Sequence, residues 1–433
     1  MRADTSDEMQ WPAHTRAFCA ELPFTQRTTI FEHGKGIQLF DSRGRDYLDA
    51  LSGVFVTCFG YDCEPIIEAM TAQLRRGLAF QPPLHGTNHN ALRLAAALAD
   101  LAPEGITTVK LLSGGSEAVE AAIRLARLYH TARGKPTKQK IISHYESYHG
   151  ATYGALALTG HPGVGVFGTP MPGAVHTLPP EALVKKWGLT AEEAGQQAAA
   201  LIEQTIEAEG PDNVAALVVE TFSQLRELAT TDPGYFTRLR EICDRHEVLL
   251  VFDEIVTGFG RTGQNFGADT VGVTPDLICA GKGISGGYAP LSALLMHERV
   301  STPFRDDNGH MAFGTTHTFS GNPIATAAGL AAVTHFTEGG FLPRIQHLSA
   351  RLRQNLTDAV GDKATVNITG LLCGISVPGA DDSDLVEAAC WRNGVIVRGM
   401  PYGIMLAPPF ITTEAQLDTI SAVVGAAIDE VVG

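Results

Sequence analysis

Along most of the chain, short apolar runs alternate with segments whose apolar residues recur at helical spacing. Six of the runs predict buried strands, at 107–112, 140–143, 214–220, 248–253, 275–280 and 290–296. The helical spacing predicts helices at 64–76, 91–101, 116–133, 193–209 and 233–246. This alternation is typical of an α/β domain, in which helices cover a largely parallel sheet.

The two ends of the chain have a different pattern. Residues 36–50 alternate apolar and polar around the turn 41–44, which predicts an antiparallel hairpin. Beyond residue 340 the pattern predicts a helix at 343–360, strands near 371–377 and 395–398, and a final helix from Glu414. We therefore expect residues 1–60 and 331–433 to form a smaller α+β domain beside a large α/β domain at 61–330.

The composition of the chain argues against several classes of binding partner. The 433 residues carry a net charge of −15, which opposes binding to nucleic acid or to anionic lipid. No run approaches the 18 apolar residues of a membrane span. The N-terminus MRADTSDEMQWP has acids where a signal peptide is basic and then apolar, so we expect the mature chain to start at Met1.

Cysteine usage agrees with a cytoplasmic protein. The seven cysteines include no CxxC and no paired Cys/His spacing, which predicts reduced core thiols and no structural metal site.

Charged side chains stand where predicted strands end. Glu220 and Asp253 end two strands, and the next strand is followed by Lys282 between glycines. In open α/β sheets the ligand crevice lies beyond the carboxyl ends of the strands, so these residues would share it. Two interpretations are open: Asp253 caps a turn and Lys282 is solvated, or the lysine forms a Schiff base with an aldehyde beside the carboxylate.

A third element is SerGlyGlySerGluAla at 113–118, a glycine turn that opens a strongly helical segment. Free N–H groups at Gly115 and Ser116 would bind an anion such as phosphate. The alternative is an ordinary helix start with Ser116 and Glu117 in its first turn. The Tyr148–His149 pair also follows a strand of this sheet, so an anion site, a lysine, a carboxylate and two aromatic rings would converge.

Taken together, these segments resemble the class III, fold-type I aminotransferases, which use pyridoxal 5′-phosphate. The resemblance covers nearly the whole chain. It is carried by ProPheThr at 23–25, TyrLeuAspAlaLeuSerGly at 47–53, SerGlyGlySerGluAla at 113–118, SerTyrHisGlyAlaThr at 147–152, ValPheAspGluIleValThrGlyPheGlyArgThrGly at 251–263, ProAspLeuIleCysAlaGlyLysGly at 275–283, HisThrPheSerGlyAsnPro at 317–323, and ValArg at 397–398 with AlaProProPheIleThr at 407–412. It implies a large domain with a mostly parallel seven-stranded sheet between helices, plus a smaller α+β domain.

The resemblance implies the catalytic residues. Lys282 would hold the cofactor as a Schiff base and move the proton between substrate and cofactor. Asp253 would keep the pyridine nitrogen protonated through a charge-assisted hydrogen bond. Ile255 and Tyr148 would lie on opposite faces of the ring.

The same resemblance assigns the remaining cofactor contacts. Gly115 and Ser116 would bind the phosphate, and His149 would lie beside the ring. Thr318 matches a threonine that reaches the phosphate from the neighbouring subunit. The resemblance thus implies a homodimer with composite active sites, or a tetramer of such dimers.

One segment departs from the family. Glu220 matches an acid near the cofactor, but the residues that follow read ThrPheSerGlnLeuArgGluLeu instead of a proline and a glycine-rich stretch. Relatives acting on ornithine or 4-aminobutyrate have a glutamate where this chain has Leu225, which argues against those substrates. Arg226 is either a solvated charge or a second anion contact, and we favour the solvated interpretation.

Substrate contacts are also implied. Arg398 matches the mobile arginine of the omega-amino acid/amine:pyruvate branch, which pairs with a carboxylate and swings out for an uncharged amine. Its alternative is a surface arginine at a strand end. Phe55 falls at an aromatic pocket wall and Phe24 within the ProPheThr signature, although either ring could belong to the core.

The sequence therefore predicts an aminotransferase that takes an amino group from an amine or omega-amino acid and passes it by a ping-pong mechanism to a keto acid, with pyruvate as the expected acceptor. Two alternatives stay open. One is a decarboxylase or aminomutase with the same fold and cofactor, and the other is a non-enzymatic protein that binds a phosphorylated ligand.

Overall fold

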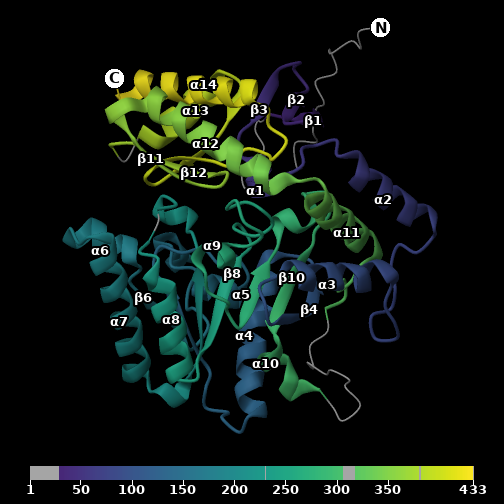
Figure 1. Ribbon diagram of the computed structural model, residues 1–433, viewed down its shortest axis with the longest axis vertical. Helices are drawn as coiled ribbons and strands as arrows, with labels where there is room; N and C mark the ends of the chain where they lie inside the picture. Colours follow the sequence, from purple (N-terminus) through teal and green to yellow (C-terminus); the bar gives the residue numbers. More distant parts are fainter. Residues whose placement is uncertain (1–28, 230, 306–316, 380–381, 433) are drawn as a thin grey trace.

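The computed structural model describes residues 29–229, 231–305, 317–379 and 382–432. Its centre is a seven-stranded sheet (Figure 1). The strands lie in the order β4 (Ile106–Leu112), β10 (Ser292–His297), β9 (Leu277–Ala280), β8 (Leu249–Glu254), β7 (Val214–Glu220), β5 (Lys140–His144) and β6 (Ala174–Thr177). Six of these strands run in the same direction, and β10, which is antiparallel to β4 and β9, runs in the opposite one. The predicted, mostly parallel seven-stranded sheet is confirmed.

Burial explains which strands the sequence reveals. Every residue of the central strands β7, β8 and β9 is buried, and each strand consists of a nearly unbroken apolar run. The edge strand β6 is mostly half-buried, and its four residues lack such a run. It was therefore not among the predicted strands.

Helices cover this sheet. They are α4 (Gly115–Ala132), α5 (Tyr153–Leu158), α6 (Pro180–Trp187), α7 (Ala191–Glu209), α8 (Gly234–Arg245), α9 (Gly267–Val271) and α10 (Glu298–Ser301). Helix α4 packs on β7 to β10. Three further helices are α2 (Glu64–Arg75), α3 (His89–Leu101) and α11 (Pro323–Glu338): α11 packs on both α2 and α3, and α3 packs on β4. Of these, α7 begins with a capping box in which Thr190 and Glu193 satisfy each other's backbone N–H groups.

Two smaller sheets lie at one end of the large sheet, on the side where Figure 1 shows β1, β2, β11 and β12. The first contains β1 (Phe31–Lys35), β2 (Gln38–Asp41), β3 (Asp46–Asp49) and β13 (Val395–Ile396), and β13 runs parallel to β3. The second is antiparallel and contains β11 (Thr365–Thr369), β12 (Leu372–Ser376), β15 (Gly403–Leu406) and β14 (Arg398–Met400). The predicted hairpin is therefore present as β2 and β3, with Gly44 at a φ of 77° in its turn.

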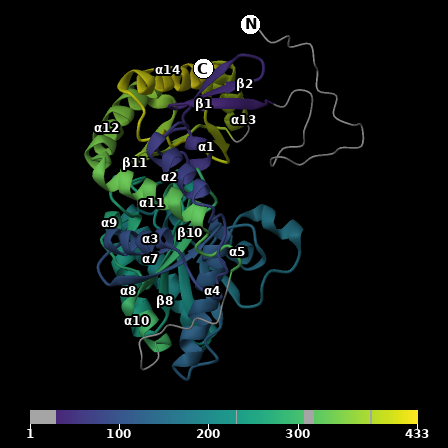
Figure 2. The same cartoon turned by 90° about the vertical axis from the view of Figure 1, so that its right-hand side faces the viewer.

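Helices α12 (Phe341–Val360), α13 (Asp382–Arg392) and α14 (Glu414–Val432) lie over these smaller sheets in both views (Figures 1 and 2). Because β3 pairs with β13, the N-terminal and C-terminal parts share one sheet. That pairing supports a small domain built from both ends of the chain. The boundaries at residues 60 and 330 stay a prediction.

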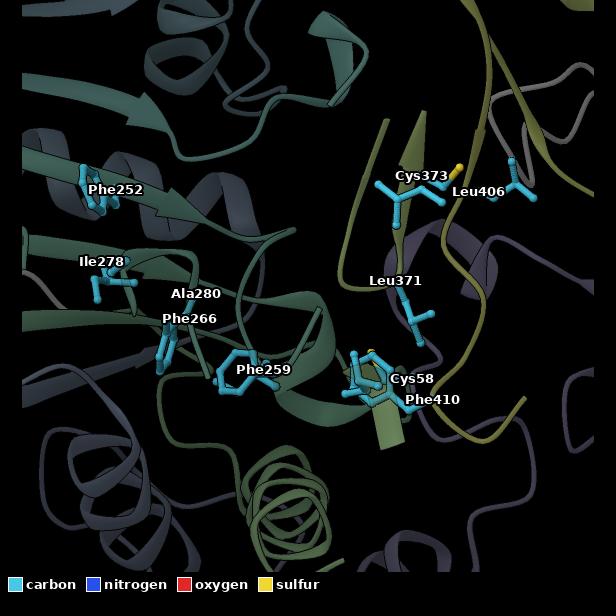
Figure 3. Close-up of a cluster of buried hydrophobic side chains, with 14 of the residues drawn as sticks. Cys58, Phe252, Phe259, Phe266, Ile278, Ala280, Leu371, Cys373, Leu406 and Phe410 are labelled. Atoms are coloured by element: carbon cyan, nitrogen blue, oxygen red, sulfur yellow. The ribbon is translucent and has the colours of Figure 1, made fainter. Parts of the chain in front are cut away.

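One continuous apolar cluster connects the large sheet to the smaller sheets (Figure 3). Phe252 and Ile278 belong to the large sheet, whereas Cys373 and Leu406 belong to the second small sheet. Phe410 lies between these two groups and stacks its ring edge-on against Phe59. The six described cysteines are all free and buried, and no described helix is long and apolar enough to cross a bilayer.

Candidate active site

Three strand ends bring Glu220, Asp253 and Lys282 to one edge of the large sheet. Glu220 pairs with Asp253 in the parallel register of β7 and β8. Lys282 follows β9 as the first residue of a 3₁₀ turn, η4 (Lys282–Ser285). Its φ of 46° lies in the left-handed region, which costs a residue other than glycine about 1–3 kcal/mol. Strain of this size persists where the surrounding structure fixes the backbone, as it does at ligand sites.

A cavity of about 200 Å³ lies at this edge. Eight of its lining residues are sequence-predicted site residues: Gly115, Ser116, Tyr148, His149, Glu220, Asp253, Ile255 and Lys282. Four others were not predicted: Gly150, Phe222, Gln224 and Val256. Phe222 and Gln224 belong to the segment that departs from the family, so the departure itself was the one available signal for them.

The amine of Lys282 is buried in this cavity, and burial lowers its pKa to about 8. Asp253 and Glu220 oppose this shift because negative charges favour the ammonium form, whereas Arg398 adds to it. The ring centroid of Phe55 lies 5.7 Å from Nζ. The amine of Lys282 therefore becomes neutral and nucleophilic at a lower pH than an exposed lysine does.

Phe55 is placed by an unusual backbone turn. It ends the short helical segment α1 (Ser52–Phe55), where Ser52, Gly53 and Phe55 all have positive φ. The buried carboxylate of Asp49 accepts the N–H groups of Leu51 (3.0 Å) and Gly53 (2.6 Å) and so holds this turn. Phe55 is thus buried, as expected of a core residue, and also lies next to Lys282, as expected of an aromatic wall of the pocket.

Asp253 is oriented by two donors. Its Oδ2 atom lies 2.8 Å from Nδ1 of His149, and its Oδ1 atom accepts the backbone N–H of Ile255 at 3.2 Å. Nε2 of His149 is buried and has no hydrogen-bond partner among the described residues. The carboxylate therefore has a fixed direction within the cavity.

Ile255 lies on a surface made of glycine backbone. A Cβ atom at Gly115 would come within 3.1 Å of its Cδ1 atom, and one at Gly281 within 2.9 Å. Any larger residue at Gly281 would displace the isoleucine from the wall of the cavity. This close approach accounts for the glycine just before Lys282.

The start of α4 presents backbone donors to the same cavity. Its N-cap residue, Gly114, makes no side-chain cap, so the first N–H groups of the helix have no side-chain acceptor there. The Ser116 hydroxyl accepts the N–H of Ala151 at 3.1 Å, and Gly150 lies so close that a Cβ would be 2.5 Å from that hydroxyl. This geometry suits a bound anion.

Arg226 corrects one prediction. We expected a solvated side chain, but Arg226 is 4% exposed and its Nε lies 3.0 Å from Oε2 of Glu181. It also donates to the carbonyl oxygen of Glu146 at 3.2 Å. The reason is electrostatic: Glu181 and Glu220 are both buried nearby, and a guanidinium compensates their charge.

Glu220 lines the cavity as a buried carboxyl group. Burial raises the pKa of its carboxyl group, while Arg226 and His149 act in the opposite direction. Its Oε2 atom accepts the Ser223 hydroxyl at 2.7 Å.

The other predicted substrate and partner contacts lie outside the cavity lining. Arg398 is half-buried at the start of β14, close enough to Lys282 to act on its pKa. Thr318 is exposed on a turn before α11. Phe24 falls outside the described residues. Within the described part of the chain, no group of three His, Cys, Asp or Glu side chains could hold a metal ion.

Comparisons with known proteins agree on one family. The model of the aminotransferase class-III family matches residues 23–428. The "Probable aminotransferase" of Mycobacterium tuberculosis is 37% identical, over 91% of this chain and 88% of its own. The omega-amino acid–pyruvate aminotransferase of Pseudomonas putida is 30% identical, over 99% of this chain and 98% of its own. A PMP-bound aminotransferase structure from Vibrio fluvialis is 28% identical with a TM-score of 0.88, over 93% of each chain.

The cavity fits pyridoxal 5′-phosphate on its own geometry. Uncapped N–H groups of α4 suit the phosphate, and the oriented carboxylate of Asp253 suits a protonated ring nitrogen. The buried Lys282 amine suits the aldehyde. The glycines at 115 and 281 leave room for Ile255 in the wall of the cavity, where it would contact one face of the ring.

Proposed function

Because the chain belongs to the class III aminotransferases, which use pyridoxal 5′-phosphate, we propose that it takes amino groups from an amine or omega-amino acid and passes them to pyruvate. The pyruvate assignment is supported by relatives named omega-amino acid–pyruvate and beta-alanine–pyruvate aminotransferase. Lys282 would carry the cofactor.

One observation supports this function above the others: a buried lysine amine with a pKa lowered to about 8 shares a cavity with a carboxylate held by His149. When bound, the cofactor supplies an aldehyde that accepts amino groups and a ring that stabilises negative charge on the neighbouring carbon. A phosphate contact alone would need neither a neutral lysine nor an oriented acid.

The chain's own residues then have distinct tasks. Lys282 would hold the aldehyde carbon of the cofactor and, once the amino donor has released its amine, would take the proton from the substrate carbon and deliver it to that former aldehyde carbon. Asp253 holds a proton on the ring nitrogen, and the start of α4 binds the phosphate. Ile255 and Tyr148 position the ring, while Phe55 keeps water away from the amine.

The carboxylate of the keto acid would pair with Arg398. A guanidinium offers two parallel N–H donors to a carboxylate, and Arg398 stands on a three-residue strand next to a turn. Such a position allows the side chain to reach the cavity for pyruvate and to leave it for an uncharged amine.

We also place the enzyme in the cytoplasm as a homodimer with shared active sites. Six buried, unpaired cysteines agree with a reducing compartment. Large apolar side chains are exposed in segments next to the cavity residues or to Thr318: Phe80, Leu84, Tyr153, Val166, Phe167 and Phe319. A partner subunit covering them would bring its own Thr318 to the phosphate.

The test is the visible spectrum of the purified protein, recorded before and after adding a panel of amines and omega-amino acids without a keto acid. We expect an absorbance band of the lysine-bound cofactor near about 410–430 nm that bleaches with a suitable donor and returns with pyruvate. Borohydride should fix the cofactor to Lys282, and Lys282→Ala should abolish turnover in a folded protein. A band that persists while carbon dioxide is released would instead show a decarboxylase.

A further inference from the structure

Gln224 lines the cavity and has a carboxamide that no other described residue satisfies. The residue is 6% exposed, and its Oε1 atom is buried without a hydrogen-bond partner. Its Nε2 atom donates to no described residue either, but it is not one of the fully buried unpaired atoms. Leaving a buried polar group unpaired costs about 1–3 kcal/mol, so folded proteins rarely keep one unless something else binds it.

The backbone of Gln224 is held from three sides. It opens a 3₁₀ turn, η3 (Gln224–Arg226), which the hydroxyl of Ser223 caps by accepting the N–H of Leu225 at 3.4 Å. Tyr402 donates its hydroxyl to the Gln224 carbonyl at 3.1 Å. At the other end of the turn, Arg226 is anchored to Glu181. The carboxamide is therefore presented to the cavity by a fixed support.

The surrounding wall is apolar. Phe222 and Val256 line the cavity with Gln224, and both belong to an apolar cluster that also contains Phe55, Leu225 and Met405. The acids of the cavity already have partners, because Ser223 donates to Glu220 and His149 contacts Asp253. Gln224 is thus the uncharged polar group of this wall that still has both a donor and an acceptor to offer.

We propose that Gln224 selects amino donors that carry a hydroxyl group, that is, amino alcohols in preference to alkylamines. A carboxamide both donates and accepts, and a hydroxyl is the smallest substrate group that can do the same. A carboxylate only accepts and would pair with Arg398 instead. The inference rests on the proposed aminotransferase function and names the class of donor that this site prefers.

The experiment compares donors of equal size. Each pair has the same number of heavy atoms: 2-aminoethanol with propylamine, 3-aminopropan-1-ol with butylamine, and 4-aminobutan-1-ol with pentylamine. The measurement is kcat/KM for bleaching of the cofactor band in single turnovers of the holoenzyme. We expect at least one amino alcohol to exceed its alkylamine partner, and Gln224→Leu to lower that ratio about 2- to 12-fold, the size of one net hydrogen bond.

Two further variants make the test specific. Gln224→Met keeps the length of the side chain without its polar atoms and should give the same loss of ratio. Phe222→Leu changes the same wall without removing a hydrogen bond, so it should alter both members of a pair alike. The cofactor band and the melting temperature of each variant establish that it is folded.

The outcomes are separable. Equal kcat/KM for every pair in the unaltered enzyme would overturn the inference, as would a ratio that Gln224→Leu and Gln224→Met leave unchanged. If no amine bleaches the band at all, the aminotransferase function itself falls, and the inference falls with it.

Discussion

His149 and Asp253 face each other across 2.8 Å in the lining of the cavity, the first through Nδ1 and the second through Oδ2. Both side chains are almost fully buried, on segments that follow β5 and end β8. The histidine thus determines where the carboxylate points. A cofactor ring nitrogen would meet an acid whose orientation is set before binding, which lowers the cost of ordering it.

Replacing His149 by leucine should therefore lower kcat by about 10- to 100-fold, the range for losing a hydrogen bond to a charged group. His149→Asn retains a donor near the position of Nδ1 and should recover part of the rate. The measurement is kcat together with the absorbance maximum of the bound cofactor, which reports the charge on its ring. If asparagine and leucine give equal losses, His149 acts through packing and not through Asp253.

The lowered pKa of Lys282 predicts how the apoprotein takes up its cofactor. Only the neutral amine attacks an aldehyde, so the rate of cofactor attachment should rise with pH and level off above about 8. An ordinary lysine would not level off until about 10.4. Stopped-flow absorbance of apoprotein mixed with pyridoxal 5′-phosphate measures this profile.

Glu220→Gln supplies the control for that profile. Glu220 raises the pKa of Lys282 by its negative charge, so its removal should shift the midpoint to lower pH. A shift to higher pH, or a midpoint near that of free lysine in the unaltered protein, would contradict the proposed environment of the amine.

Arg398→Ala should separate the two halves of the reaction. Loss of the guanidinium should raise KM for pyruvate by 10-fold or more, since a charged hydrogen-bonded pair contributes about 1.5–3 kcal/mol. Bleaching by an alkylamine, which has no carboxylate, should change about twofold at most, within the usual effect of a surface substitution. Arg398→Lys keeps the charge without the paired donors, so its KM for pyruvate should lie between those of the parent enzyme and Arg398→Ala. Equal losses for both substrates would remove Arg398 from the carboxylate role.

The local pattern of apolar and polar residues was sufficient to predict much of the fold and the residues at the centre of the candidate site. Unbroken apolar runs marked β7, β8 and β9, and the residues ending two of these strands, Glu220 and Asp253, pair in register. The glycine turn at 113–118 was predicted as an anion site and lines the cavity, whereas the close approaches of Gly115 and Gly281 to Ile255 became visible only in the structure. Each of these signals lies within a few residues of the feature that it predicts.

Contacts between segments that lie far apart in the sequence could not be predicted from these local patterns. Arg226 was expected in solvent because nothing near it in the sequence indicates Glu181, a partner on another helix. For Gln224 the only signal was the departure of its segment from the family, because its unpaired carboxamide becomes visible only when the cavity is assembled. The roles of Thr318 and Phe24 stay predictions, because the first depends on a partner subunit and the second lies outside the described residues.

The buried pair of Arg226 and Glu181 gives a prediction about stability. Their side chains are 4% and 10% exposed, so removing either one leaves the other as a buried charge without its ion-pair partner. We expect Arg226→Met and Glu181→Gln each to lower the free energy of unfolding by about 3–5 kcal/mol. The double variant should cost clearly less than the sum, because it leaves neither charge behind.

Arg392 and Glu430 provide the matched surface pair, with Nη2 and Oε1 2.6 Å apart and both side chains 57% exposed. Arg392→Met should cost no more than about 1 kcal/mol, because water and salt screen an exposed ion pair. Denaturant unfolding of the four variants and the parent measures all of these values. Additive losses at Arg226 and Glu181, or losses as small as that at Arg392, would mean that the buried pair is not coupled and that Arg226 is compensated elsewhere. Strong coupling would make the Arg226 anchor the reason that η3 holds Gln224 at the cavity wall.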